Sequence, residues 1–232
     1  MTAPAGPRLH HVRFPGESDE YRSARDKLLA AEIALRRQVE AVSEQRRKLP
    51  LGGAAIDYTF DEWDCAADAA KRVTLSGLFE AGKDTLLLYS LMFLPGPSGV
   101  PLEAGCPSCT SIIDAIDGEV PHITQRINFA VVARAPIDRF RAHADSRGWR
   151  HARLLSSAHT TYNRDYQAET PDGSQVAMAT VFVRRAGQIR HTWSTELMLV
   201  PSHPGQDYRH VDFMWPLWGI LDRTPEGRGT DG

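Results

Sequence analysis

Two cysteines spaced three residues apart form the segment with the clearest chemical potential, Cys106-Pro107-Ser108-Cys109. This spacing serves either a dithiol that cycles to a disulfide or one half of a metal site. A thiolate is the nucleophile in disulfide exchange, and the N–H groups and dipole of a helix N-terminus stabilise it. We therefore predict that Cys106 attacks, and that Cys109, one helical turn later on the same side, resolves the mixed disulfide.

Three further residues are predicted to support this pair. Pro107 suits the first turn of a helix and restrains the loop, and Ser108 lies between the cysteines. His122 follows the predicted cysteine helix after one loop and is expected near the dithiol. The alternative for His122 is an exposed or hydrogen-bonded histidine without a catalytic role.

A metal site is the alternative chemistry for the cysteine pair, and two buried core cysteines are the structural alternative. Zinc needs four ligands, or three with water. The further candidates show no ligand spacing: Cys65, His122, His143, His151 and His159. Cys65 has acidic neighbours, which raise a thiol pKa, so we predict no reactive role for it. We predict no bound metal or cofactor.

The predicted site needs a strand before the cysteines and a helix after them. Residues 84–93 form an almost continuous apolar run, which favours a strand buried on both faces of a parallel or mixed sheet. A loop rich in proline and glycine leads from there to the cysteines. Helical spacing then continues over residues 110–116, which predicts that the pair lies at a helix N-terminus.

Further strands and helices alternate along the rest of the chain, as in an α/β fold. Residues 128–133 are predicted as a strand and 136–147 as a helix, with Pro136 at its start and Gly148 at its end. Strands are also predicted at 58–60 and 73–75, with an acidic, alanine-rich connection between them. Residues 177–183 and 189–199 are predicted to form a hairpin.

The first fifty residues differ from the remainder. Residues 1–17 lack periodicity and read as an irregular arm, whereas apolar residues from Tyr21 to Val42 recur at helical intervals. Ser18 can cap a helix that runs to about Lys48 before Pro50 stops it. We predict two parts, an arm and long helix (1–50) packed on the core and a main domain (51–232). The apolar stripe also makes a homodimer an expectation.

The C-terminal segment is rich in large aromatic side chains, notably Phe213, Trp215 and Trp218, with Met214 beside them. Helical spacing of such residues favours core or dimer contact over a ligand groove. Arg228 either clamps an anion or forms a surface salt bridge, and the sequence does not separate these alternatives.

Composition excludes several functional classes. The 232 residues carry a net charge of −2 and no basic cluster, which disfavours nucleic-acid binding. No apolar stretch is long enough to span a bilayer or to resemble a secretory signal, so we expect a cytoplasmic protein that binds no membrane. Motifs for phosphate loops, paired-carboxylate glycosidases and serine hydrolases are absent.

Several separated segments together resemble the bacterial thioredoxin-like proteins of the DUF899 family. They are Phe14-Pro15-Gly16-Glu17-Ser18, Tyr21-Arg22, Ala24-Arg25, Arg46-Arg47-Lys48-Leu49-Pro50, Leu78-Phe79, Met92-Phe93, the cysteine motif with Asp114, Ala133-Arg134-Ala135-Pro136, Leu221-Asp222 and Thr224-Pro225-Glu226-Gly227-Arg228. The resemblance covers nearly the whole chain. It implies a thioredoxin-like α/β fold, with a mixed central sheet flanked by helices, a long N-terminal helical extension and a redox dithiol.

Two departures from better-characterised thioredoxin-like enzymes limit what this resemblance implies. The stretch 178–182 lacks the proline that such enzymes place before the strand facing the dithiol, which keeps the metal alternative open. Glu103 stands where peroxiredoxin-like relatives carry Thr or Ser, so direct peroxide reduction by Cys106 is not expected. We predict a thiol-disulfide oxidoreductase acting on a disulfide-bearing protein or a small thiol. The alternative is a non-catalytic module that binds metal or a protein partner through the cysteine loop and the tryptophan-rich tail.

Overall fold

The computed structural model describes residues 9–64, 67, 69–94, 103–196, 199–201 and 214–224. The chain divides into two compact units, Met1–Pro50 and Leu51–Gly232. Cys65, Phe213, Arg228 and the side chain of Trp218 lie outside the described residues.

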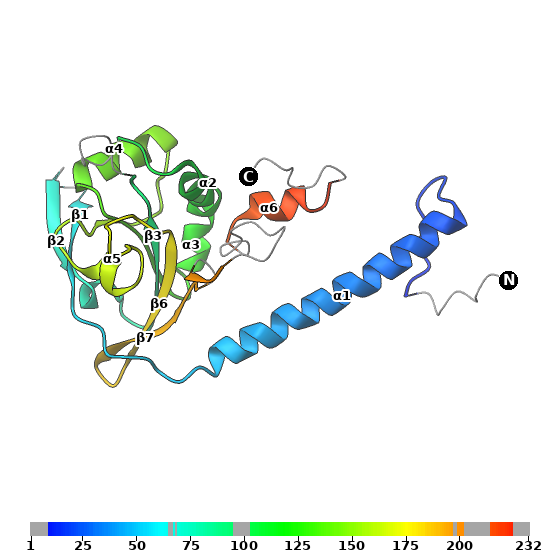
Figure 1. The fold of residues 1–232 in the computed structure, drawn as a ribbon, viewed down its shortest axis with the longest axis horizontal. Helices are drawn as coiled ribbons and strands as arrows, with labels where there is room; N and C mark the ends of the chain where they lie inside the picture. The colour runs from blue at the N-terminus through cyan, green and yellow to red at the C-terminus, as the bar shows by residue number, and fades with distance from the viewer. Residues whose placement is uncertain are drawn as a thin grey trace. The chain divides into compact units, whose positions relative to one another are not determined.

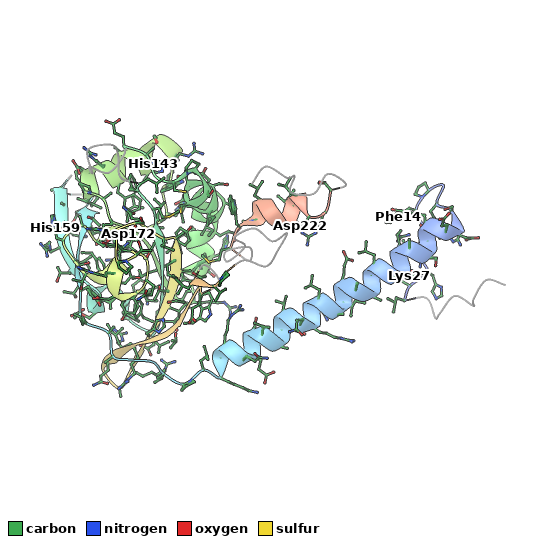
Figure 2. All side chains as sticks on the ribbon, in the orientation of Figure 1. Phe14, Lys27, His143, His159, Asp172 and Asp222 are labelled. Carbon is green, nitrogen blue, oxygen red and sulfur yellow. The ribbon has the colours of Figure 1, made fainter. Side chains whose placement is uncertain are left out.

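The first unit contains one long helix, α1 (Asp19–Arg47), drawn in blue in Figure 1. Ser18 caps it, because its Oγ accepts a hydrogen bond from the backbone N–H of Tyr21 at 3.1 Å. The preceding segment folds back on the first turns of α1, where buried Arg22 donates to the carbonyls of His10 and Val12. The guanidinium of Arg25 lies 4.1 Å from the centre of the ring of Phe14, a residue of the preceding segment that Figure 2 labels. Packing of this unit on the main domain remains a prediction.

The second unit is built on a seven-stranded mixed sheet in the order β2-β1-β5-β4-β3-β6-β7 (Figure 1). The strands are β1 (Thr59–Asp64), β2 (Ala69–Thr74), β3 (Thr85–Leu91), β4 (Asn128–Ala133), β5 (Leu154–Ser156), β6 (Met178–Arg185) and β7 (Gln188–Ser194). Strand β3 is an interior strand of the sheet, parallel to β4 on one side and antiparallel to β6 on the other.

The helices of this unit connect or follow these strands. They are α2 (Pro107–Ile116), α3 (Val120–Ile123), α4 (Ile137–Arg147), α5 (Tyr162–Asp165) and α6 (Pro216–Leu221), with short 3₁₀ turns at Ser76–Leu78 and Asp117–Glu119. None of the described helices combines the length and apolar character that a membrane-spanning segment needs.

The topology around β3 is thioredoxin-like. A parallel β3-α2-β4 unit is followed, after α4, by the antiparallel hairpin β6-β7 and then by α6. In the spatial order β4-β3-β6-β7, β3 of the βαβ unit lies beside β6 of the hairpin. Strands β5, β1 and β2 extend the sheet beyond β4. The expected α/β fold is confirmed, and α2 is the next helix along the chain after the carboxyl end of β3.

The predicted elements compare well with the observed ones in the core and less well at the β1-β2 edge. The predicted helix at 136–147 is α4, and Gly148 ends it in the left-handed conformation at φ 75°. The acidic connection expected after residue 60 is mostly strand, because Asp61–Asp64 pair with Ala69–Arg72 in an antiparallel hairpin. Along β1 the side chains of Phe60 and Glu62 are buried and those of their neighbours are part-exposed. Because one of the two buried residues is charged, a search for alternating apolar residues does not detect this strand.

Two hydrophobic clusters cover the two faces of the sheet. Tyr89 and Leu91 of β3 belong to one cluster with Cys109, Ile112 and Ile113 of α2. Leu86 and Leu88 belong to the other cluster. Alternation along β3 therefore directs Tyr89 and Leu91 toward the helix that carries the cysteines.

Asp117 fixes the far end of α2. Its carboxylate is nearly buried and accepts three backbone hydrogen bonds, from Arg150, His151 and Ala152, at 2.8–3.0 Å. Earlier on α2, Asp114 pairs with Arg147 and accepts a hydrogen bond from Trp149 Nε1 at 2.8 Å. The two carboxylates thus tie α2 to the end of α4 and the segment after it.

We expect Asp117→Ala to destabilise the domain by about 2 kcal/mol, because three part-buried backbone N–H groups lose their acceptor. Asp117→Asn retains one carbonyl acceptor and should cost less. Urea unfolding of both variants and the wild type measures this difference. Equal stability of Asp117→Ala and the wild type would contradict the tether described above.

Candidate active site

Cys106 occupies the N-cap position of α2, with Pro107 in the first turn as expected. Its backbone N–H donates to the carbonyl of Met92 at 2.8 Å, and its carbonyl accepts from Thr110 N–H at 2.9 Å. The first bond joins the cysteine to the chain just after β3, and the second begins the helical hydrogen-bond pattern. Cys106 is therefore fixed between the central strand and the helix.

Gly105 allows this close approach. A Cβ at this position would lie 2.8 Å from Leu91 Cδ2 and 3.2 Å from His143 Nε2. No side chain larger than hydrogen fits there without a shift of its neighbours. Even a methyl group at position 105, directly before the candidate nucleophile, would therefore displace the Leu91 side chain.

The surroundings of Cys106 favour its thiolate. The pKa of Cys106 is lowered to about 5, chiefly by a hydrogen bond from the Cys109 side chain and against the opposing effect of burial. Backbone N–H groups of Cys109 and Ser108 and the Ser108 hydroxyl add to this stabilisation. The thiol is partly exposed, so a charged nucleophile is accessible to a substrate near neutral pH.

Cys109 has the opposite character. It is 1% exposed, and its hydrogen bond to Cys106 together with burial raises its pKa well above the ordinary value. Cys109 therefore remains a protonated donor while Cys106 is the acceptor. The pair is divided into one accessible thiolate and one buried thiol.

The other predicted site residues lie in two places. Pro107 and Ser108 are exposed beside Cys106. The structure does not bring His122 to the cysteines, because it is exposed on α3, which leads into the start of β4. Since β3 and β4 are parallel, the start of β4 lies at the sheet edge opposite the start of α2.

His143 is brought to the site without having been predicted as its support. It lies on α4 (Figure 2), is 7% exposed, and its Nε2 lies 3.1 Å from Thr110 Oγ1. Its ring packs edge-on against Phe93 and Trp149 at centroid distances of 5.5 and 5.3 Å. Burial lowers the pKa of His143, so a neutral imidazole supports the first turn of α2.

Trp215 connects the C-terminal segment to the same helix. Its Nε1 donates to Ser111 Oγ at 3.0 Å, and its side chain is 9% exposed. It belongs to the core cluster that contains Cys109. Trp215 therefore packs in the core, as the sequence favoured for this segment.

The residues that could hold a metal are few. Within the described ranges, no three or more His, Cys, Asp or Glu side chains gather as a metal site. His151 and His159 are exposed, and His143 faces Thr110. The described histidines thus supply no further ligands to the cysteine pair.

Comparison with known proteins gives a family and distant structural neighbours. The family described as "Bacterial protein of unknown function (DUF899)" matches residues 11–232. A search of curated proteins found no match.

Three solved structures illustrate the structural similarity, each by identity, coverage of this chain and of the other, and TM-score. Plasmodium vivax 2-Cys peroxiredoxin in reduced form is 19% identical, with 71% of this chain and 95% of that chain covered and a TM-score of 0.46. Mycobacterium tuberculosis peroxidoxin BcpB is 16% identical, with 72% and 94% covered and a TM-score of 0.44. A cysteine-to-serine mutant of Xanthomonas campestris peroxiredoxin Q is 15% identical, with 75% and 97% covered and a TM-score of 0.45. Similarity at this level assigns no activity to this chain.

Alkylation by iodoacetamide as a function of pH should give Cys106 a midpoint near 5, far below the ordinary value of about 8.5. Cys109→Ala should raise the midpoint more than Ser108→Ala, because the Cys109 hydrogen bond contributes most to the lowering. A wild-type midpoint near the ordinary value would contradict this description of the site.

A second prediction concerns His143. Because its pKa is lower in the folded protein than in the unfolded chain, the unfolded chain takes up a proton first as pH falls below about 6.5. Wild-type stability should then fall relative to His143→Gln, which keeps a polar partner for Thr110 but does not titrate. Chemical unfolding at a series of pH values measures this, and a constant difference between the two proteins would refute it.

Proposed function

The chain belongs to the DUF899 family, and we propose that it is a thiol-disulfide oxidoreductase in which Cys106 attacks and Cys109 resolves. The observation that carries this proposal is the division of the pair into an accessible thiolate and a buried thiol. Two structural cysteines in a core have no need of such a difference. A nucleophile and a resolving group do.

The first step consumes the Cys106 thiolate. Its sulfur attacks one sulfur of a substrate disulfide, a bond forms between them, and the substrate disulfide breaks. The leaving thiolate takes a proton from solvent, and Cys106 is left in a mixed disulfide. Donors at the N-terminus of α2 hold Cys106 ionised for this attack.

The second step uses Cys109. Its thiol loses a proton, its sulfur attacks Cys106 Sγ, and the second substrate thiolate leaves and is protonated. The substrate has gained two electrons, and the enzyme holds a Cys106–Cys109 disulfide. A dithiol reductant returns the two electrons and regenerates both thiols.

The exposure of Pro107 and Ser108 beside a partly exposed Cys106 supports a substrate that approaches from outside the domain. Such a substrate is a disulfide-bearing protein or a small disulfide.

Oxidised glutathione is a suitable probe of the first step. In a Cys65→Ser background, Cys109→Ser should accumulate one glutathione adduct on Cys106, since the resolving thiol is missing. The protein with both Cys106 and Cys109 should instead form its internal disulfide, and Cys106→Ser should form neither product. Intact mass and peptide mapping identify the products. Equally fast glutathionylation of Cys106→Ser would contradict the proposed roles.

A further inference from the structure

Tyr89 lies directly behind the candidate dithiol. It is on the central strand β3, fully buried, on the face that packs against α2. Its backbone is fixed between Val131 of β4 and Ala179 of β6. Both residues belong to the core cluster that contains Tyr89 and Cys109. The position of the phenol is therefore set by the centre of the sheet.

The hydroxyl of Tyr89 lacks a normal partner. Among the residues that the structure describes, Tyr89 Oη makes no hydrogen bond of ordinary geometry, although water does not reach it. Buried hydroxyl groups are nearly always paired, because an unpaired one loses its hydration without compensation. A buried phenol that makes no hydrogen bond of ordinary geometry beside a reactive pair is therefore a candidate for a hydrogen bond that strengthens during the reaction.

The candidate partner of the Tyr89 hydroxyl is Cys109, which lies in the same core cluster. Burial raises the pKa of Tyr89 well above its ordinary value, and the adjacent Cys109 raises it further. The phenol thus stays protonated and acts only as a donor. In turn, the hydrogen bond to Cys106 and burial raise the pKa of Cys109, whereas Tyr89 acts in the opposite direction.

We propose that Tyr89 is a catalytic residue of the resolving step, donating a hydrogen bond from its Oη to the Cys109 thiolate. This inference rests on the proposed function. In the reduced protein Cys109 donates to Cys106, so its own sulfur carries no charge for Tyr89 to stabilise. Once Cys106 is in a mixed disulfide, Cys109 must ionise inside the core, and the Tyr89 hydroxyl is the buried donor beside it.

Protons and electrons balance without consuming Tyr89. The Cys109 proton leaves to solvent, the new bond forms between the Cys109 and Cys106 sulfurs, and the bond from Cys106 to the substrate sulfur breaks. The departing thiolate is protonated by solvent. Tyr89 keeps its proton throughout, and its only effect is to lower the energy of the buried Cys109 thiolate.

Stopped-flow reaction with dithiobis(nitrobenzoate) separates the two steps in a Cys65→Ser background. Attack by Cys106 releases the first thionitrobenzoate, and resolution by Cys109 releases the second. Tyr89→Phe should leave the first phase unchanged and slow the second on the order of tenfold, the effect expected for loss of a charge-assisted hydrogen bond. The pH midpoint of the second phase should also rise.

Tyr162→Phe is the matched control, because Tyr162 is fully buried, its Oη is also unpaired, and it lies in the cluster of the other sheet face. It should leave both phases unchanged. A slower second phase in both variants, or in neither, would overturn the role of Tyr89. Absence of a second phase in the parent protein would instead overturn the proposed function.

Tyr89→Phe removes a hydroxyl that makes no hydrogen bond of ordinary geometry, so the variant should fold, which thermal unfolding checks. Site-specific 3-fluorotyrosine at position 89 provides an independent test if it does not. Fluorine makes the phenol a stronger donor, so the second phase should accelerate. An unchanged second phase in this variant would also refute the proposal.

Discussion

The hydrogen bond from Cys109 to the Cys106 thiolate is the interaction on which the candidate site depends. It requires both sulfurs on one side of α2 and Cys106 at the helix N-cap. The surrounding structure meets these requirements: Met92 anchors Cys106, Gly105 admits the close packing, and Asp117 fixes the other end of the helix. The fold therefore contributes chiefly by holding one helix in place against one strand.

Opposite pKa shifts in the two cysteines have a consequence for redox equilibrium. A stabilised Cys106 thiolate favours the reduced protein over the disulfide, because the disulfide has no such charge to stabilise. A buried Cys109 delays its own ionisation until Cys106 is engaged. The same arrangement thus makes the disulfide a better oxidant and orders the two thiols in time.

Local sequence signals predicted the strands and helices that carry the site. They did not predict the contacts between residues far apart in the sequence. The apolar run gave β3, and Pro136 with Gly148 bounded α4, because both signals act within a few residues. His122 was expected near the dithiol from its position in the chain, but the parallel strands carry it to the opposite edge. His143 and Asp117 meet partners about thirty residues away, so spacing could not reveal their roles. Tyr89 and the adjacent Ser90 did carry a signal, as two hydroxyl side chains within an apolar run of β3.

The most direct test of the central claim is the redox equilibrium of Cys106 and Cys109, measured by thiol trapping in glutathione buffers of known potential. We predict a reversible internal disulfide with a single two-electron midpoint within the range of known oxidoreductases, about −270 to −120 mV. Cys106→Ser and Cys109→Ser should each abolish it. Failure of the wild-type pair to form that disulfide across the buffer series would contradict the dithiol mechanism.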